Sequence, residues 1–404
     1  MRLFLFTNFF PFKGSEPFLV NEFNYTHTYF SNIDILPLYG QLEDTSIKAI
    51  VHQPVFEKFK ATQILSKGLF NFKNFGYHFK EVLQLGLIWQ AKKLYWNISG
   101  CLIARAFQNH PIFNLIIKQS KIETCVLYFY WGDGMVNAIP YLVEKANVVN
   151  LKIVIRFHGS DLYEHLKSNY SPLRKEIFKH VNLLCTVSET GKNYLIQKYP
   201  EVQSKIFVSK LGVAKNEFKS LNSSETITIV SASSIIPLKR VKLIFESLQL
   251  TKTKINWHHF GAGEGLRELT EIVKNARPSL SVKLHGLVTN QVILNFYKQN
   301  PVHLFINLST SEGIPVSIME AYSFGIPAIA TNVGGTGELV NNNNGRLINV
   351  NSNAQSIAKT IEELIQKPVE EFTKLKEEAH RKFESDFSAE HNYPLFYEKM
   401  LEFK

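Results

Sequence analysis

Two glutamates in the C-terminal half have the type and spacing to bind a hydroxyl-rich ligand. Glu312 and Glu320 lie eight residues apart in SEGIPVSIMEAYSFGIPAIATN, which follows the apolar run HLFINL. Carboxylates at the end of a strand can accept hydrogen bonds from sugar or ribose hydroxyls. A helix that begins at Pro315 would present unpaired N–H groups beside them. On spacing alone, a helix-capping acid and a solvated helix residue explain the pair equally well.

Two further segments carry basic side chains. Lys239 and Arg240 stand at the expected start of a helix, where positive charge opposes the helix dipole unless an anion binds there. His158 follows the strand candidate LKIVIRF and precedes Asp161. A single histidine after a strand is more often structural than functional, so a functional role for His158 depends on the pattern of the residues around it.

The elements that must position these residues follow an alternating pattern. From about residue 225, short β-branched runs such as TITIVSA and PAIATN alternate with amphipathic segments, which indicates βαβ units around a parallel sheet. The first half has the same pattern, with strand candidates such as LFLFTNFF and CVLYFYW. We therefore predict two Rossmann-like domains, 1–212 and 225–387, joined by a polar linker, and a last helix, 388–404, that packs back on the first domain.

Length and composition agree with this plan. A chain of 404 residues is longer than a single hydrophobic core usually accommodates, so two domains are expected. A hydrophobic content of 45% excludes disorder as the main state. The net charge of +10 favours anionic partners. The three cysteines have no CxxC spacing, so a zinc cluster or a disulfide framework is not supported and a reducing cytosol fits best. We expect no signal peptide and no membrane-spanning helix.

A basic aromatic region at about 55–100 leaves two interpretations open. Its Phe, Tyr, Trp and Lys residues are typical of a helix pair that lies on an anionic bilayer. The alternative, which we favour, is a helical insertion whose aromatic side chains form core and whose lysines are solvated.

The Glu312 segment resembles the Glu-x7-Glu signature of the retaining glycosyltransferases of family 4, also called group 1, and of their bacterial surface-polysaccharide members. The resemblance extends through Gly325, Gly334 and Gly335 to the NNNNGRLI stretch. It implies the α/β GT-B fold, in which two doubly wound Rossmann-like domains face a central cleft.

The same resemblance assigns roles on the donor side. Glu312 would hold donor-sugar hydroxyls, the backbone from Gly313 through Ile314 and Pro315 to Val316 would line the sugar ring, and Glu320 would bind the nucleotide ribose. Lys239 matches the family lysine that clamps the donor diphosphate. Ser234 stands where the family usually has arginine, a departure for which Arg240 could compensate.

In the first domain, IRFHGSDLYEHL is similar to the family's His-Gly-x-Asp element. It implies that His158 reaches the donor sugar and is catalytic together with Glu312, that Asp161 supports the loop or acceptor, and that Arg156 belongs to the same wall. The opening TNFFPFKGSEPF implies that Gly14 approaches the donor phosphates and that Ser15 and Glu16 face the acceptor. Trp131 is either acceptor-facing or core.

Other chemistries lack their signatures. None of the five aspartates forms Asp-x-Asp, and no GxxxxGK[ST], GxSxG or HExxH motif occurs, so we expect no metal and no cofactor. GAGEGLREL has the spacing GxGxG, and the following strand candidate VKLHG ends without the acidic residue that would bind an NAD ribose.

The predicted function is transfer of a sugar, with retention, from a nucleotide-diphosphate donor to a saccharide or lipid-linked acceptor in cell-surface polysaccharide biosynthesis. The protein would act in the cytoplasm, with peripheral contact to the inner membrane face. The alternatives are a GT-B epimerase or donor hydrolase and, more remotely, a non-enzymatic basic protein that binds membrane or nucleic acid. We expect no nucleic-acid partner.

Overall fold

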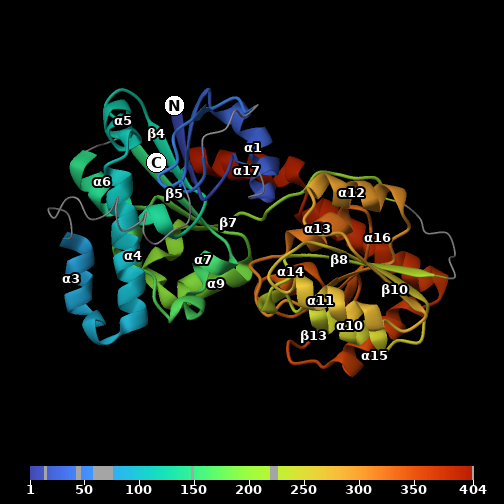
Figure 1. Cartoon of the computed structure of the whole chain (residues 1–404). Helices are drawn as coiled ribbons and strands as arrows, with labels where there is room; N and C mark the ends of the chain where they lie inside the picture. The colour runs from blue at the N-terminus through green and yellow to red at the C-terminus, as the bar shows by residue number, and fades with distance from the viewer. Residues whose placement is uncertain (13–15, 42–46, 58–75, 147–149, 219–225, 403–404) are drawn as a thin grey trace. The chain divides into compact units, whose positions relative to one another are not determined.

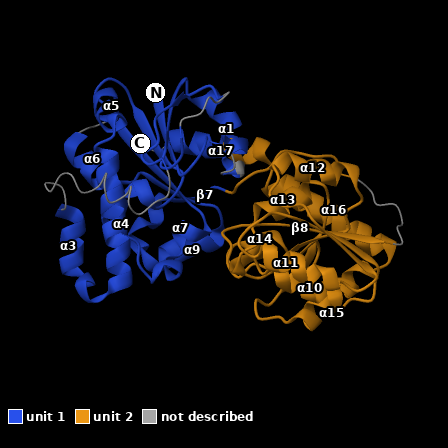
Figure 2. Ribbon diagram, viewed as in Figure 1, with its two compact units in different colours: residues 1–209, 394–404 blue, residues 210–393 orange. Residues whose placement is uncertain are grey.

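The computed structural model describes residues 1–12, 16–41, 47–57, 76–146, 150–218 and 226–402. The chain divides into two compact units, residues 1–209 with 394–404, and residues 210–393 (Figure 2). Each unit contains a parallel sheet with helices around it (Figure 1). None of the helices in the described ranges combines the length and hydropathy that crossing a bilayer requires.

The first unit is built on a sheet whose strands lie in the order β3-β2-β1-β4-β5-β6-β7, with every described pairing parallel. The strand order reverses direction between β1 and β4, which makes this pair the topological switch point. The strands are β1 Arg2–Thr7, β2 Asn32–Pro37, β3 Ile50–Val51, β4 Cys125–Phe129, β5 Leu151–Phe157, β6 Leu183–Thr186 and β7 Ile206–Val208.

Alternate side chains of these strands enter two separate hydrophobic clusters, as expected for a sheet covered on both faces. Phe4 and Phe6 pack against helices from the middle of the unit's sequence, such as α4 and α5. Leu3 and Leu5 pack against α1 and α17, the first and last helices described. The helices are α1 Pro17–Tyr29, α3 Gly76–Gln84, η2 Leu87–Trp89, α4 Ala91–Gln108, α5 Pro111–Gln119, η3 Gly134–Ala138, α6 Ile139–Ala146, α7 Gly159–Leu162, η4 Glu164–Lys167, α8 Arg174–His180, α9 Glu189–Lys198 and η5 Pro200–Lys205.

The second unit has a parallel sheet in the order β10-β9-β8-β11-β12-β13, with its switch point between β8 and β11. Its strands are β8 Ile227–Ala232, β9 Ile255–Phe260, β10 Leu280–Leu284, β11 Leu304–Asn307, β12 Ala328–Thr331 and β13 Gly345–Ile348. Its helices are η6 Pro237–Lys239, α10 Val241–Gln249, α11 Leu266–Ile272, η7 Val273–Asn275, α12 Asn290–Gln299, α13 Val316–Ser323, α14 Thr336–Leu339, α15 Ala354–Ile365 and α16 Val369–Asp386. The predicted alternation of strands and helices is confirmed.

The last helix, α17 (Ala389–Glu402), begins in the second unit and ends in the first. Phe396, Tyr397 and Met400 are fully buried in the cluster that holds Leu3 and Leu5. The Tyr397 hydroxyl lies 2.6 Å from the Thr26 hydroxyl of α1. The two ends of the chain therefore cover the same face of the first sheet.

Candidate functional site

The loops that leave β8 and β11 form the donor-side candidate in the second unit. They emerge at the C-terminal edge of the sheet, at its switch point, which is where open α/β sheets bind ligands. The β8 loop leads into η6, which ends at Lys239, and the β11 loop carries Glu312.

Lys239 and Glu312 bridge these two loops. The Lys239 Nζ donates to Glu312 Oε1 at 2.6 Å, and the Asn307 amide reaches the same oxygen at 3.3 Å. Both charged side chains remain partly accessible, at 23% and 12% of their side-chain surface. The two residues that the sequence assigned to different parts of a donor are thus adjacent, and a cation and an anion are held side by side where a ligand would enter.

Arg240 occupies a different position from the one expected. Its backbone is left-handed, with φ of 48°, and its guanidinium donates to the carbonyl oxygens of Leu308 at 2.6 Å and Val350 at 2.5 Å. This geometry makes Arg240 a brace between loops and does not support a compensating phosphate contact. Ser234 is exposed on the β8 loop, and only its carbonyl oxygen has a described bond, to the Ile236 N–H.

Gly334 and Gly335, in the loop after β12, contact the backbone of the Glu312 loop. Gly334 has φ of +52°, and a Cβ added there would lie 1.8 Å from the Glu312 carbonyl oxygen. The Gly335 N–H donates to the Gly313 carbonyl oxygen at 2.8 Å. The backbone can approach the Glu312 loop this closely only without a side chain at position 334, which explains the glycine there.

Helix α13 begins directly after this loop. Pro315 is its N-cap, as predicted, and Val316 is its first residue, so the segment from Gly313 to Val316 leads into a helix N-terminus. The Ile314 and Pro315 side chains are buried, whereas Gly313 and Val316 are half-buried.

Glu320 lies one turn into α13 and is 8% exposed. Its Oε1 accepts a hydrogen bond from the Asn290 amide of α12 at 2.7 Å. Burial raises the pKa of Glu320 to about 7, and the bond from Asn290 offsets only part of that effect. Sequence reasoning missed Asn290, because it lies 30 residues away in a helix with no motif of its own.

The acceptor-side candidate lies at the switch point of the first sheet, in the loops after β1 and β4. Gly14 and Ser15 lie outside the described residues. The Glu16 carboxylate accepts the backbone N–H groups of Phe9 at 2.8 Å and Phe10 at 2.6 Å, a longer one from Asn8 at 3.2 Å, and the Trp131 indole N–H. Because these donors occupy the acceptor capacity of the carboxylate, the geometry does not support an acceptor contact for Glu16 in this conformation.

His158 lies at the end of β5 among aromatic rings. Its ring centroid is 4.5 Å from that of Trp131 and 4.8 Å from that of Tyr130. Burial, and secondarily the charge of Arg156, keep the pKa of His158 well below its usual range. Neither ring nitrogen has a hydrogen-bond partner within the described part of the chain, so a neutral imidazole with unused bonding capacity lies beside half-buried Trp131.

Asp161 fixes the loop that carries His158. One carboxylate oxygen accepts the His158 N–H at 2.7 Å and the other accepts the Gly132 N–H at 2.6 Å. Burial raises the pKa of Asp161 to about 6, with a further contribution from Asp133. Asp161 thus joins the loops after β4 and β5, the supporting role that the resemblance implied.

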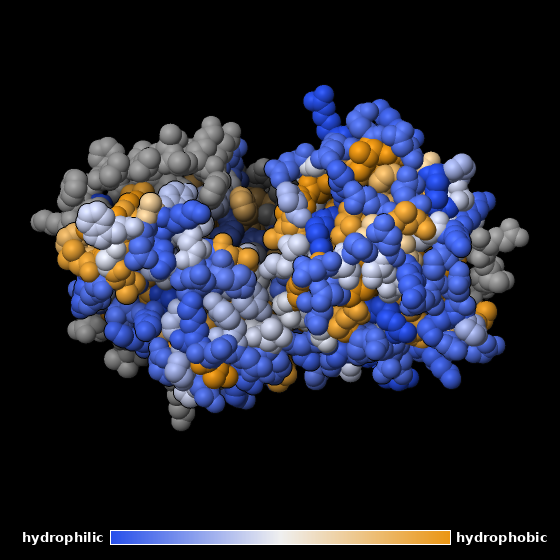
Figure 3. All heavy atoms as spheres, turned by 90° about the horizontal axis from the view of Figure 1, so that it is seen from below, coloured by the Kyte–Doolittle hydropathy of each residue, from blue (hydrophilic) through white to orange (hydrophobic). Residues whose placement is uncertain are grey.

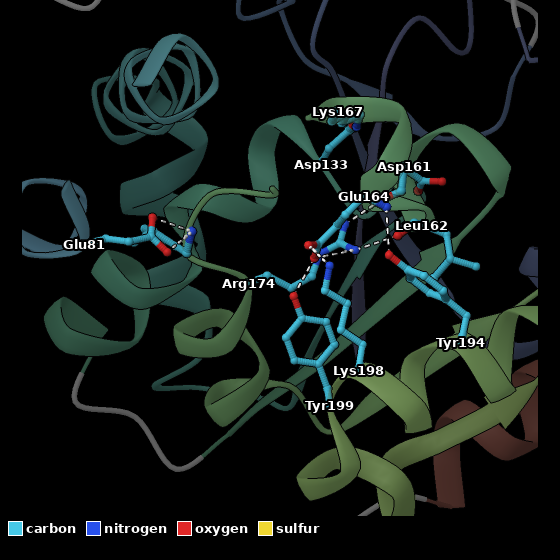
Figure 4. A network of polar contacts seen from close by, with 11 residues as sticks. Glu81, Asp133, Asp161, Leu162, Glu164, Lys167, Arg174, Tyr194, Lys198 and Tyr199 are labelled. Atoms are coloured by element: carbon cyan, nitrogen blue, oxygen red, sulfur yellow. Dashed lines mark hydrogen bonds and ion pairs between the residues drawn. The ribbon is translucent and has the colours of Figure 1, made fainter. Parts of the chain in front are cut away.

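A polar network holds this loop from behind (Figure 4). Arg174 donates to the carbonyl oxygens of Asp161 at 2.5 Å and Leu162 at 2.8 Å, and lies 3.5 Å from Glu164. Glu164 also accepts from Lys198 and Tyr199. The His158 loop is therefore braced by α8 and α9, which no motif indicated.

Arg156 does not belong to the wall of the site. Its side chain is fully buried, donates to Glu22 and to the Ser209 hydroxyl, and lies 4.3 Å from the centroid of the Phe396 ring. Because strand side chains alternate in direction, Arg156 points to the face of the sheet covered by α1 and α17.

A cavity of about 250 Å³ lies next to these loops in the first unit. Tyr39, Tyr95 and Trp96 give it aromatic walls, and Asp133 and Lys167, which form an ion pair, add polar groups. Aromatic faces combined with a few polar groups suit a sugar ring, which has apolar C–H faces and polar hydroxyls.

Two doubly wound parallel sheets, each with polar residues gathered at its switch point, define a protein of the GT-B class. Solved structures agree. The chain matches the lipopolysaccharide outer core galactosyltransferase WaaB with a TM-score of 0.69 and 13% identity, over 99% of each chain. It matches HepE of Anabaena in complex with UDP with a TM-score of 0.66 and 14% identity, over 99% of this chain and 100% of that one.

Sequence comparisons add to the fold. Residues 213–382 of the second unit match the family model "Glycosyl transferases group 1". The putative colanic acid biosynthesis glycosyltransferase WcaL of Escherichia coli is 24% identical over 65% of this chain and 67% of its own length. The amylovoran biosynthesis glycosyltransferase AmsK of Erwinia amylovora is 22% identical over 60% of this chain and 62% of its own length. The chain is thus similar to bacterial surface-polysaccharide glycosyltransferases across about two thirds of their length.

Proposed function

We propose that this protein is a retaining glycosyltransferase that moves a sugar from a nucleotide-diphosphate donor to a saccharide or lipid-linked acceptor in cell-surface polysaccharide biosynthesis. The observation that carries the proposal is the Lys239–Glu312 pair at the switch point of the unit that matches the group 1 glycosyltransferases. The names of WcaL and AmsK favour a surface polysaccharide as the product. We place the reaction in the cytoplasm, where nucleotide sugars are made.

On the donor side, a diphosphate would draw the Lys239 ammonium away from Glu312. The freed carboxylate can then accept hydrogen bonds from sugar hydroxyls, while the ammonium offsets the charge that develops on the departing nucleotide. Glu320 would accept a bond from a ribose hydroxyl. No residue of the second unit's loops is proposed as a covalent nucleophile, and the leaving phosphate would itself help to take the acceptor proton.

On the acceptor side, we propose that the aromatic cavity of the first unit holds the acceptor sugar. For His158 we propose the contact with the donor sugar that the resemblance implies: its neutral imidazole would donate one hydrogen bond and accept another, which suits a sugar hydroxyl better than a charged group. The work of the protein is then positioning and charge stabilisation, without a metal ion.

Nucleotide binding tests the donor half directly. Thermal unfolding should be measured with UDP, GDP, ADP and CMP and their sugars, with and without magnesium. We expect one nucleotide to raise the melting temperature without metal, and Lys239→Ala to abolish that rise while leaving the unliganded protein folded. Lys242→Ala is the matched control, since this lysine lies three residues further on and pairs with Glu268 at the surface.

The outcomes separate the rivals. Absence of stabilisation by every nucleotide, or full stabilisation of Lys239→Ala, would contradict the donor site. Release of free nucleotide from a nucleotide sugar without any acceptor would indicate a hydrolase, and a changed sugar configuration an epimerase. A steep loss of nucleic-acid affinity with salt would instead support the non-enzymatic alternative.

A further inference from the structure

The hairpin formed by α3, η2 and α4 carries large apolar side chains that face solvent. Figure 1 shows α3 and α4 beside each other at one end of the first unit, and Figure 3 shows hydrophobic side chains gathered at that end of the molecule. We call the following five residues the hairpin surface: Phe79 (59% exposed), Leu83 (58%), Leu85 (51%), Ile88 (59%) and Trp89 (91%).

The spacing of these residues makes the surface continuous. Phe79 and Leu83 are four residues apart in α3 and so lie on one side of that helix. Leu85, Ile88 and Trp89 follow in the turn that joins α3 to α4, where Gly86 adopts φ of +59°. A contiguous apolar patch of this kind on a soluble protein marks an interaction surface.

The hairpin's own charged residues that face solvent have one sign. Lys80, Lys92 and Lys93 lie in or beside it, and Glu81 is the only acidic residue between positions 76 and 100. Glu81 is turned inward: its carboxylate accepts the Tyr170 hydroxyl at 2.5 Å and the Leu173 N–H at 3.0 Å. The charge that the hairpin presents to solvent is therefore positive.

The same inward contacts hold the hairpin against the unit. Asn97 of α4 donates to Glu81 at 2.9 Å and to the Tyr170 hydroxyl at 2.8 Å, which ties α3, α4 and the segment before α8 together. His78 and Leu87 are buried on the inner side. Of the region at about 55–100, residues 58–75 lie outside the described residues. Within the hairpin, Tyr77 packs against the core cluster, whereas Phe79 and Trp89 face solvent and are not core.

We propose that the hairpin surface binds a bilayer rich in anionic lipids from one side. Trp89 and its apolar neighbours would enter the region between headgroups and acyl chains, and the three lysines would lie among lipid phosphates. Apolar contact and positive charge are both needed for this occupant, and the surface supplies both. The inference concerns where the protein acts and stands apart from the donor site in the second unit.

Vesicle binding tests the proposal on the full chain. Flotation with vesicles that contain about one third phosphatidylglycerol should recover the protein, and pure phosphatidylcholine vesicles should recover much less. We expect Leu85→Ser/Ile88→Ser/Trp89→Ser, and separately Lys92→Gln/Lys93→Gln, to weaken binding about tenfold or more. The matched controls are Ile122→Ser/Leu287→Ser/Val369→Ser, which removes three apolar side chains that are 71%, 83% and 71% exposed elsewhere, and Lys274→Gln/Lys359→Gln.

A spectroscopic readout keeps the test valid if a triple variant folds poorly. Brominated lipids should quench the fluorescence of the wild-type protein, and Trp89→Phe should lose that quenching yet still float with the vesicles. Nucleotide-induced stabilisation of the hairpin variants should match the wild type, so failure of the donor proposal remains distinguishable.

Three results would overturn the proposal: no flotation with anionic vesicles, equal flotation of hairpin and control variants, or quenching that persists in Trp89→Phe. A concentration-dependent dimer that the hairpin variant abolishes, measured by light scattering, would assign the surface to a second copy of the chain instead.

Discussion

At the scale of single residues, the environment of Glu320 predicts a pH-dependent stability. Its pKa is raised from 4.5 to about 7, so the folded state holds this proton more tightly than the unfolded state does. The stabilisation is complete below the unfolded value and is lost as pH rises through about 7, by about 3 kcal/mol at most. Glu320→Gln, which cannot ionise, should lose less stability between about pH 5 and about pH 8 than the wild type does.

Urea unfolding at both pH values, with hydrogen exchange of α13 peptides as the local probe, measures this difference in stability. Glu363→Gln is the control, because that side chain is 58% exposed. Identical pH profiles for wild type and Glu320→Gln would show that Glu320 is ionised or solvated in the folded protein.

What the sequence could foresee at this scale depends on whether a residue's partner is local. The start of α13 at Pro315 and the loop-supporting Asp161 were predicted because their partners lie within a few residues or within a motif. The hydrogen bonds of the Glu16 and Arg240 side chains were not predicted, because their partners include main-chain atoms that only the fold brings close to them. Residue type alone cannot tell a group free for ligand from one already satisfied.

At the scale of elements, close contact between two turns predicts an unusual sensitivity at Gly334. An alanine there would combine a left-handed backbone with a Cβ 1.8 Å from the Glu312 carbonyl oxygen, so the Glu312 loop must move. Gly286 has a similar φ of +69° but no atom within 4 Å of an added Cβ. We expect Gly286→Ala to cost only about 1–2 kcal/mol of backbone strain, and Gly334→Ala to cost more and to reduce nucleotide binding.

Melting temperatures with and without the stabilising nucleotide compare the two alanine variants. If both retain the full nucleotide-induced rise, the contact between the turns does not position Glu312.

The order of strands and helices was largely predictable from hydrophobic periodicity, because the central strands of both sheets are buried. The hairpin of α3 and α4 was less so. Its aromatic residues face both inward and outward, and periodicity cannot separate core from exposed surface where both are apolar.

At the scale of the whole molecule, α17 predicts that a residue following the second unit in sequence stabilises the first. Met400 is fully buried in the cluster beneath β1 and β4. Met400→Ala should therefore cost about 2–5 kcal/mol and accelerate hydrogen exchange in β1 and β4, but not in β8 to β13. Leu395→Ala, at a side chain 47% exposed, should change little.

Equal acceleration in both sheets would show that the two units unfold as one, and no acceleration in β1 and β4 would remove α17 from the first unit's core. The polar stretch near 212–225 was predicted as the boundary, and the structure divides the chain between residues 209 and 210. The sequence also predicted that a last helix, 388–404, packs back on the first domain, and residues 394–404 do belong to the first unit. Which face of the sheet this helix covers was not predictable, because it depends on the face that the other helices leave uncovered.

The ion pair between Lys239 and Glu312 also determines how strongly a ligand must attract Lys239 in order to bind. An anion that approaches Lys239 must compete with a carboxylate already 2.6 Å away, so binding is an exchange of one negative partner for another. A uridine or adenosine without phosphate offers no replacement, and one phosphate offers less charge than two. The pair would thereby discriminate among ligands by charge before any contact with the sugar is made, and neutralising Glu312 would make the site less discriminating as well as less active.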